Sequence, residues 1–172
     1  FRLGAPSISN PRVTIFRRMP GSDETGAITI DFGGSVCSTV GWSVVEFDGV
    51  VITGVNGADA ITNEGSAFVS TSTLTSASIT LPNSVTAGNA TYGGFVHLYF
   101  NEGSTPGDGF ETLHNVFSSE WCSLLTEWDA DPVDNVVDAS WSSATNRTLA
   151  YAFELVAAEE APETGVFPRR RY

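Results

Sequence analysis

Acidic side chains alternate along the stretch Glu127-Trp128-Asp129-Ala130-Asp131. In a β-strand, alternate side chains point to the same face of the sheet, so Glu127 and Asp129 would lie side by side. Two neighbouring carboxyl groups can act as nucleophile and general acid in the hydrolysis of a glycosidic bond. This stretch is therefore the first candidate for catalysis in the chain.

The spacing argues against a complete catalytic set. Glycosidases of the lectin-like jelly-roll class carry an E-x-D-x-x-E signature, and Pro132 stands where its last Glu belongs. The chain is also short for the long loops that form the cleft of such enzymes. We favour an edge strand that runs into an acidic turn, and we predict that the protein is not an enzyme. A small jelly-roll glycosidase is the least favoured alternative.

The histidines and cysteines show no spacing typical of a metal site. His97 and His114 lie in strand-like stretches, where a histidine is usually a satisfied, partly buried side chain. Cys37 and Cys122 belong to no C-x-x-C motif, and no G-x-S-x-G turn marks a nucleophilic serine. The two cysteines form either one disulfide or two buried thiols. We predict no cofactor and no zinc.

An acidic loop offers an alternative ligand set. Asp129, Asp131, Asp134 and Asp138 could gather around calcium, which takes six to eight oxygen ligands. Their spacing misses the EF-hand loop, because neither its Gly nor its final Glu is present. We favour a solvated acidic loop, with structural calcium as the alternative.

Four tryptophans could provide a platform for stacking on sugar rings. Trp42 and Trp141 lie in apolar stretches, which favours a place in the core, whereas Trp121 and Trp128 are better candidates for exposure. A glycan is therefore a possible ligand, and a carbohydrate-binding β-sandwich module is the alternative function.

Positive charge is concentrated at the two ends of the chain. All eight basic residues are arginines, and seven of them lie within residues 1–18 and 169–171. One arginine and all twenty acidic residues lie between, so the body carries −19 and the ends carry +7. Large apolar residues accompany these arginines, and we predict that both ends are arms that connect the acidic body to its neighbours. The predicted interface residues are Arg12, Phe16, Arg17, Arg18, Val166, Phe167, Arg169, Arg170 and Arg171.

Short strand-like segments separated by turn signals make up the body. Strands are predicted over 12–17, 28–32, 67–75, 77–81, 95–100, 110–117, 118–128, 136–141 and 149–156. Residues 36–51 are predicted to form one or two strands with a break at Gly41. Loops are predicted over 53–66, 84–94, 101–109 and 129–134. This pattern predicts an all-β protein, an antiparallel β-sandwich of jelly-roll-like or immunoglobulin-like layering. We expect the sandwich over residues 27–157, with an N-terminal arm over 1–26 and a C-terminal arm over 158–172.

Composition narrows the partners. A net charge of −12 repels phosphate, which argues against direct binding to nucleic acid. No apolar run approaches the roughly 20 residues needed to cross a bilayer. A hydrophobic content of 41% is ample for a folded core.

A resemblance to a known domain is carried by GWSVVEFDGV, NATYGGFVHLYFNEGSTPGDGFETLHNV and TEWDADPVDNVVDASWSSATNRTLAYAFEL. These segments resemble a domain of many uncharacterised proteins that tailed phages and their bacterial hosts encode, over residues 27–157. The resemblance implies a β-sandwich structural component of a virion, assembled in the host cytoplasm. We therefore expect a capsid decoration or cement protein, or a repeated tail component. Its partners would be other copies of itself or the major capsid or tail proteins.

Overall fold

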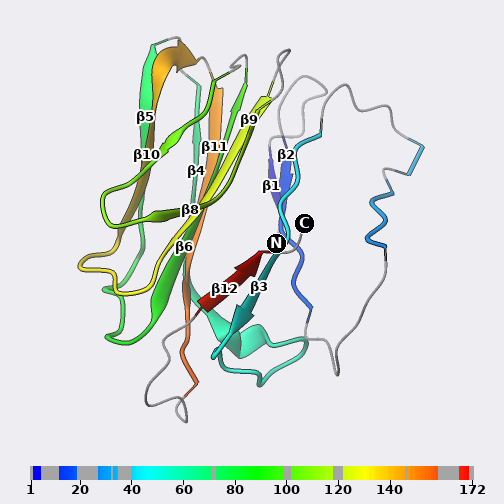
Figure 1. Ribbon diagram of the computed structural model, residues 1–172, viewed down its shortest axis with the longest axis vertical. Helices are drawn as coiled ribbons and strands as arrows, with labels where there is room; N and C mark the ends of the chain where they lie inside the picture. The colour runs from blue at the N-terminus through cyan, green and yellow to red at the C-terminus, as the bar shows by residue number, and fades with distance from the viewer. Residues whose placement is uncertain are drawn as a thin grey trace.

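Two antiparallel sheets pack face to face as a β-sandwich in this computed structural model, which confirms the predicted fold class (Figure 1). The five-stranded sheet has the order β4-β11-β6-β9-β8, and the three-stranded sheet has the order β5-β10-β7. One short 3-10 helix, η1 (Ala58–Ala60), precedes β4. The structure describes residues 2–4, 12–18, 27–31, 33–34, 40–70, 73–98, 102–117, 122–145, 147–158 and 167–170.

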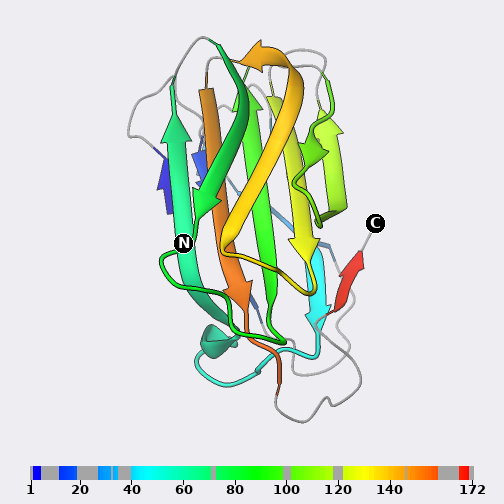
Figure 2. The ribbon, with the colours of Figure 1, turned by 90° about the vertical axis from the view of Figure 1, so that its left-hand side faces the viewer.

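The strands of the two main sheets pair antiparallel throughout. The larger sheet contains β4 (Ile61–Val69), β6 (Ala90–Leu98), β8 (Glu111–Phe117), β9 (Cys122–Asp129) and β11 (Arg147–Leu155). The smaller sheet contains β5 (Leu74–Thr80), β7 (Thr105–Pro106) and β10 (Val136–Thr145). Figure 2 looks onto the smaller sheet, with the strands of the five-stranded sheet behind it.

Two short pairs of strands form a further layer. One is β1 (Arg2–Gly4) with β2 (Arg12–Thr14), and the other is β3 (Val45–Asp48) with β12 (Phe167–Arg170). In Figure 1 both pairs lie on the side of the five-stranded sheet opposite β5 and β10. We call this side of the five-stranded sheet the outer face.

The five-stranded sheet is buried on both faces, and β11 shows how its sequence provides for this. Small side chains, Ala150 and Ala152, pack in the cluster that faces the three-stranded sheet. The larger side chains of Leu149, Tyr151 and Phe153 alternate with them and belong to a second cluster on the outer face. The bulkier half of the core thus lies beneath the short strand pairs rather than between the two main sheets.

The outer face is rich in aromatic rings. Tyr92 on β6 stacks on Phe153 with ring centroids 4.9 Å apart, and Phe47 on β3 meets Tyr92 edge-on at 5.7 Å. Val13 on β2 is only 8% exposed, and Ile15 packs against the same cluster. Strand β3 and the segment around β2 are therefore parts of the core.

Several predicted boundaries are wrong. Residues 27–31 form no strand, and Ile28 and Ile30 are 64% and 46% exposed, because their alternation meets no partner strand. Of the predicted 36–51, the structure describes residues 40–51, and within these only Val45–Asp48 forms a strand. The predicted loop 53–66 contains η1 and the start of β4, whose alternate polar side chains face outward at a sheet edge.

Two further loops were overextended. The predicted loop 84–94 contains the start of β6, and the predicted loop 101–109 contains β7. Gly93 and Gly94 favour a loop in the sequence, but in the structure they are strand residues at which close packing leaves no room for a side chain. A Cβ on Gly94 would overlap the Tyr151 ring, and one on Gly93 would lie 2.5 Å from Cγ1 of Val137. The predicted strand over 118–128 is confirmed for its described part by β9.

Candidate functional site

The N-terminal segment is anchored on the outer face and then turns its charged residues outward. Val13 and Ile15 contact the aromatic cluster, whereas Phe16 is 85% exposed and Arg17 and Arg18 are exposed. A strand that is fixed by its apolar side chains thus presents a phenylalanine beside two arginines. Arg12 lies in β2, where its backbone is the register partner of Gly4 in β1.

The C-terminal arm contributes a strand to the same layer. Strand β12 pairs antiparallel with β3, and the register places Arg169 opposite Glu46 and Arg170 opposite Val45. Phe167 is the register partner of Asp48. Val166 and Arg171, also predicted as interface residues, lie outside the described residues.

A chain of hydroxyl groups holds the segment before β3 on the sheet. Ser43 Oγ lies 2.8 Å from Nδ1 of His114 on β8 and 3.3 Å from Oγ1 of Thr126 on β9. Burial raises the pKa of Tyr92, and its hydrogen bonds with Tyr151, Thr126 and Ser43 oppose that shift. Ser43 and His114 have the spacing of a nucleophile and a base. The Ser43 hydroxyl also contacts Thr126, however, which points it toward the sheet. We therefore interpret it as a structural contact that holds residues 40–47 on the sheet.

This role of Ser43 is one that sequence reasoning missed. Strand alternation identifies the face on which His114 lies, but nothing in the sequence connects it to a serine 71 positions earlier. The predicted state of His114, a partly buried and hydrogen-bonded side chain, is confirmed.

Of the three tryptophans that the structure describes, only Trp42 is exposed, so these three form no stacking platform. Trp42 is 59% exposed, whereas Trp128 is 6% exposed, so the prediction was wrong for both. Trp128 lies on the outer face of the sheet beneath the short strand pairs, and its indole N–H donates to Glu111. Trp141 is buried as predicted, and Trp121 lies outside the described residues.

The carboxyl group of Glu127 lies inside the sandwich. Strand β9 runs between β6 and β8, so the predicted edge strand is wrong, although β9 does run into the acidic turn. Glu127 is fully buried, its Oε2 accepts the N–H of Gly107, and its Oε1 has no hydrogen-bond partner among the described residues. Burial, helped by the nearby charge of Asp138 and opposed by the hydrogen bond from Gly107, raises the pKa of Glu127 to about 8. In this conformation no substrate reaches Glu127.

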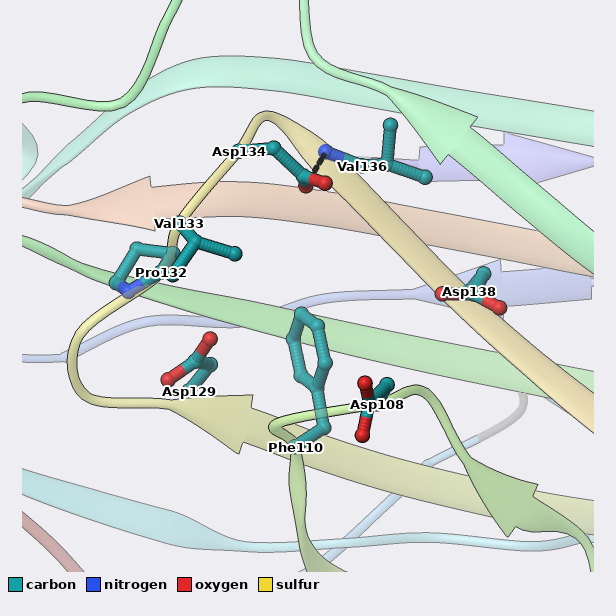
Figure 3. A pocket seen from close by; sticks show the side chains of 8 residues that line it. All are labelled: Asp108, Phe110, Asp129, Pro132, Val133, Asp134, Val136 and Asp138. Atoms are coloured by element: carbon teal, nitrogen blue, oxygen red, sulfur yellow. Dashed lines mark hydrogen bonds between the residues drawn. The ribbon is translucent and has the colours of Figure 1, made fainter.

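Acidic residues converge on a pocket of about 150 Å³ beside the turn that joins β9 to β10 (Figure 3). In the view of Figure 3, Asp129 and Asp138 lie on either side of the Phe110 ring. The lining residues are Asp108, Phe110, Asp129, Pro132, Val133, Asp134, Val136 and Asp138.

Three of the four predicted calcium ligands line this pocket, and Asp131 does not. Two of the carboxylates are used by the turn itself. Asp129 Oδ1 accepts the N–H of Asp131 at 3.0 Å, and Asp134 Oδ1 accepts the N–H of Val136 at 2.8 Å. Within the described ranges, no three side chains of His, Cys, Asp or Glu are grouped as metal ligands.

His97 is hydrogen-bonded, as predicted, but it is fully buried rather than partly buried. Its Nδ1 lies 3.2 Å from Oγ1 of Thr148 and its Nε2 lies 3.0 Å from Oγ of Ser104. The ring also packs on Trp141 with centroids 3.8 Å apart. Burial lowers the pKa of His97 to about 4, so the imidazole is neutral at physiological pH.

The structure describes only one of the two cysteines. Cys122 is half-buried at the start of β9, and burial raises the pKa of its thiol. Cys37 lies outside the described residues, so the choice between a disulfide and two thiols stays a prediction.

Comparison with protein-family models, curated proteins and solved structures finds no match to this chain. In the part of the chain that the structure describes, no helix is long and apolar enough to cross a bilayer. The function must therefore be argued from the surface itself.

Proposed function

We propose that this protein is a non-enzymatic structural component that works by assembly. The proposed setting is a virion, where it would decorate or cement a capsid or form a repeated part of a tail. The setting rests on the resemblance of residues 27–157 to phage-encoded domains, and the mode of assembly rests on the surface described above. Its partners would be further copies of the chain or other acidic subunits.

The observation that carries this proposal is the exposure of Phe16 beside Arg17 and Arg18, directly after an anchored strand. Burial of a phenylalanine side chain contributes about 1.5–3 kcal/mol. An exposed ion pair contributes about 0–1 kcal/mol. Phe16 would therefore provide most of the affinity, whereas the two arginines would steer the arm toward an acidic neighbour.

The charge distribution indicates that the partner of the basic arms is an acidic surface. The body carries one arginine and twenty acidic residues, so two bodies repel each other at low salt. Basic arms that dock on the acidic surface of a neighbour offset this repulsion. Repetition of such contacts over a symmetric lattice raises the overall affinity well above that of a single contact.

Light scattering on the intact protein, at low and at high salt, tests the proposal. We expect the intact chain to assemble and Phe16→Ser to reduce its mass in solution. Arg17→Glu should weaken assembly mainly at low salt, because exposed charges are screened at high salt. Val133→Ser is the matched control, since Val133 is an apolar side chain that is 98% exposed in the acidic turn between β9 and β10. A wild-type chain that stays monomeric at millimolar concentration, or equal assembly of all variants, would overturn the proposal.

A further inference from the structure

Strand β3 is an acceptor for an added strand. It belongs to neither main sheet, its Val45 and Phe47 pack on the aromatic outer face, and its partner in the sheet is β12. The register joins four consecutive residue pairs, from Phe167 opposite Asp48 to Arg170 opposite Val45. Addition of an extended segment to such a strand gains affinity from backbone hydrogen bonds.

The two strands are complementary in charge. In the sequence, β3 contains Glu46 and Asp48, and β12 contains Arg169 and Arg170. The backbone register sets Arg169 opposite Glu46 and Arg170 opposite Val45. Proline within sheets is confined to edge strands or bulges, and β12, which contains Pro168, is an edge strand of its two-stranded sheet.

We infer that β12 is an exchangeable strand and that β3 of one copy accepts the C-terminal strand of a second copy in the assembled protein. This inference rests on the proposed assembly function, and it names the partner and the mode of contact. Both arrangements make the same backbone pairs, because the exchanged strand has the same sequence. Exchange of an identical element is accordingly a low-cost route to an oligomer.

The balance between the two arrangements depends on concentration. Residues 159–166 join β12 to the body, and a short connection gives the strand an effective concentration in the millimolar range at its own β3. Dilute chains should therefore keep their own strand. Exchange should become frequent when copies reach millimolar concentration or lie next to one another in an assembly.

Disulfide trapping between two single-cysteine chains tests this inference. In a background with Cys37→Ser and Cys122→Ser, one chain carries Glu46→Cys and the other carries Arg169→Cys. The mixture is oxidised at micromolar and at millimolar concentration, and covalent heterodimers are measured. A second pair, Asp48→Cys with Phe167→Cys, reports on the same register at an independent position.

The matched control is Asp48→Cys with Arg169→Cys, which lies two residues off the register. Directly opposed Cβ atoms are about 4.5–5.5 Å apart, and diagonal ones about 7–8 Å apart, which is too far for a disulfide. We expect both on-register pairs to give about tenfold more heterodimer than the control at millimolar concentration. The double variant Glu46→Cys with Arg169→Cys in one chain should instead close on itself at micromolar concentration.

Two results separate this inference from the proposed function. If light scattering of the same samples shows assembly while on-register and off-register pairs crosslink equally, strand exchange is wrong and assembly through the arms stands. If nothing assembles even at millimolar concentration, the proposed function itself fails, and strand exchange fails with it.

Discussion

The carboxyl group of Glu127 on β9 accepts the backbone N–H of Gly107, the residue after β7, across 3.3 Å. This contact joins the five-stranded sheet to the three-stranded sheet inside the sandwich. The side chain is fully buried, and burial raises its pKa to about 8. At neutral pH the folded protein therefore holds a neutral carboxylic acid at the junction of its two sheets.

Glu127 should make the folded state less stable as the pH rises. Between the ordinary pKa of 4.5 and the folded-state pKa of about 8, the folded chain keeps a proton that the unfolded chain has lost. The contribution of this group is fully present below pH 4.5, falls by about 1.4 kcal/mol per pH unit, and is lost by about pH 8. Glu127→Gln is always neutral, so it should abolish the decline in the free energy of unfolding that urea titrations of the wild type show between pH 6.5 and pH 8.

The control for this change is Glu64→Gln, because Glu64 is exposed on the edge strand β4. It should leave the pH profile of the wild type unchanged. An identical decline in Glu127→Gln and in the wild type above pH 6.5 would show that Glu127 is not the group responsible.

His97 should have the opposite effect at lower pH. Burial lowers its pKa from 6.5 to about 4. Between these two pH values, His97 is therefore protonated in the unfolded chain and neutral in the folded chain. The contribution of His97 is fully present above pH 6.5 and is lost as the pH falls toward 4, again by about 1.4 kcal/mol per unit. From pH 4.5 to 6.5 the slopes of His97 and Glu127 should cancel.

The wild-type free energy of unfolding should therefore be nearly flat from pH 4.5 to 6.5 and decline from 6.5 to 8. His97→Gln should decline over the whole range from 4.5 to 8, because the opposing slope is gone. The double variant His97→Gln with Glu127→Gln should be flat throughout, although less stable, since His97 also contacts Thr148 and Ser104. A single variant that keeps the wild-type profile would contradict this account.

Glu154 on β11 should stabilise the fold as a buried carboxylate that accepts hydrogen bonds from neutral donors. Its Oε1 accepts the N–H of Thr86 at 2.9 Å and Nδ2 of Asn89 at 2.6 Å, and its Oε2 accepts Nδ2 of Asn63 at 3.0 Å. Burial alone would raise the pKa of Glu154, but these hydrogen bonds outweigh it and lower the pKa. Glu154→Gln turns an amide NH₂ toward these donors, so it should cost about 2–3 kcal/mol in urea unfolding at pH 7.

The sign of the pKa shift provides a further check on Glu154. A lowered pKa means that its contribution is present above the ordinary pKa of 4.5 and is lost as the pH falls below it. The cost of Glu154→Gln should therefore shrink below pH 4.5. An equal cost at pH 3.5 and pH 7 would show that the substitution acts through packing rather than through the charge.

The strand pattern of the sequence was enough to predict a β-sandwich, but not the further layer of short strands on its outer face. The pattern of β11 places alanines on one face and large side chains on the other, and this predicts a strand buried on both sides. Which face receives a second layer depends on contacts between distant segments. The apolar neighbours of Trp42 predict a place in the core, but its side chain is 59% exposed. The segment of Trp42 covers the buried Leu124, since a Cβ added to Gly41 would lie 3.5 Å from the Leu124 side chain.

The candidate site was predictable only in part for the same reason. Charge counting identified Phe16, Arg17 and Arg18, because a run of like charge beside an apolar residue is visible in one segment. The burial of Glu127 was missed, since it depends on Gly107 and Asp138 reaching it from the other sheet. Contacts between residues so far apart in the chain produce no recognisable spacing motif in a single sequence.

Gly94→Ala should loosen the attachment of the outer layer. A Cβ at this position would overlap the Tyr151 ring, which packs against Tyr92 with centroids 6.1 Å apart. The ring must move, and an overpacked core typically costs about 1–3 kcal/mol. Gly41→Ala is the matched control, because its Cβ would meet Leu124 at an ordinary 3.5 Å. We expect a lower urea midpoint for Gly94→Ala alone and higher hydrogen exchange in β3, whose Phe47 rests on Tyr92. A Gly94→Ala variant as stable as Gly41→Ala would show that Tyr151 can turn aside freely, and that the aromatic cluster does not fix the outer layer.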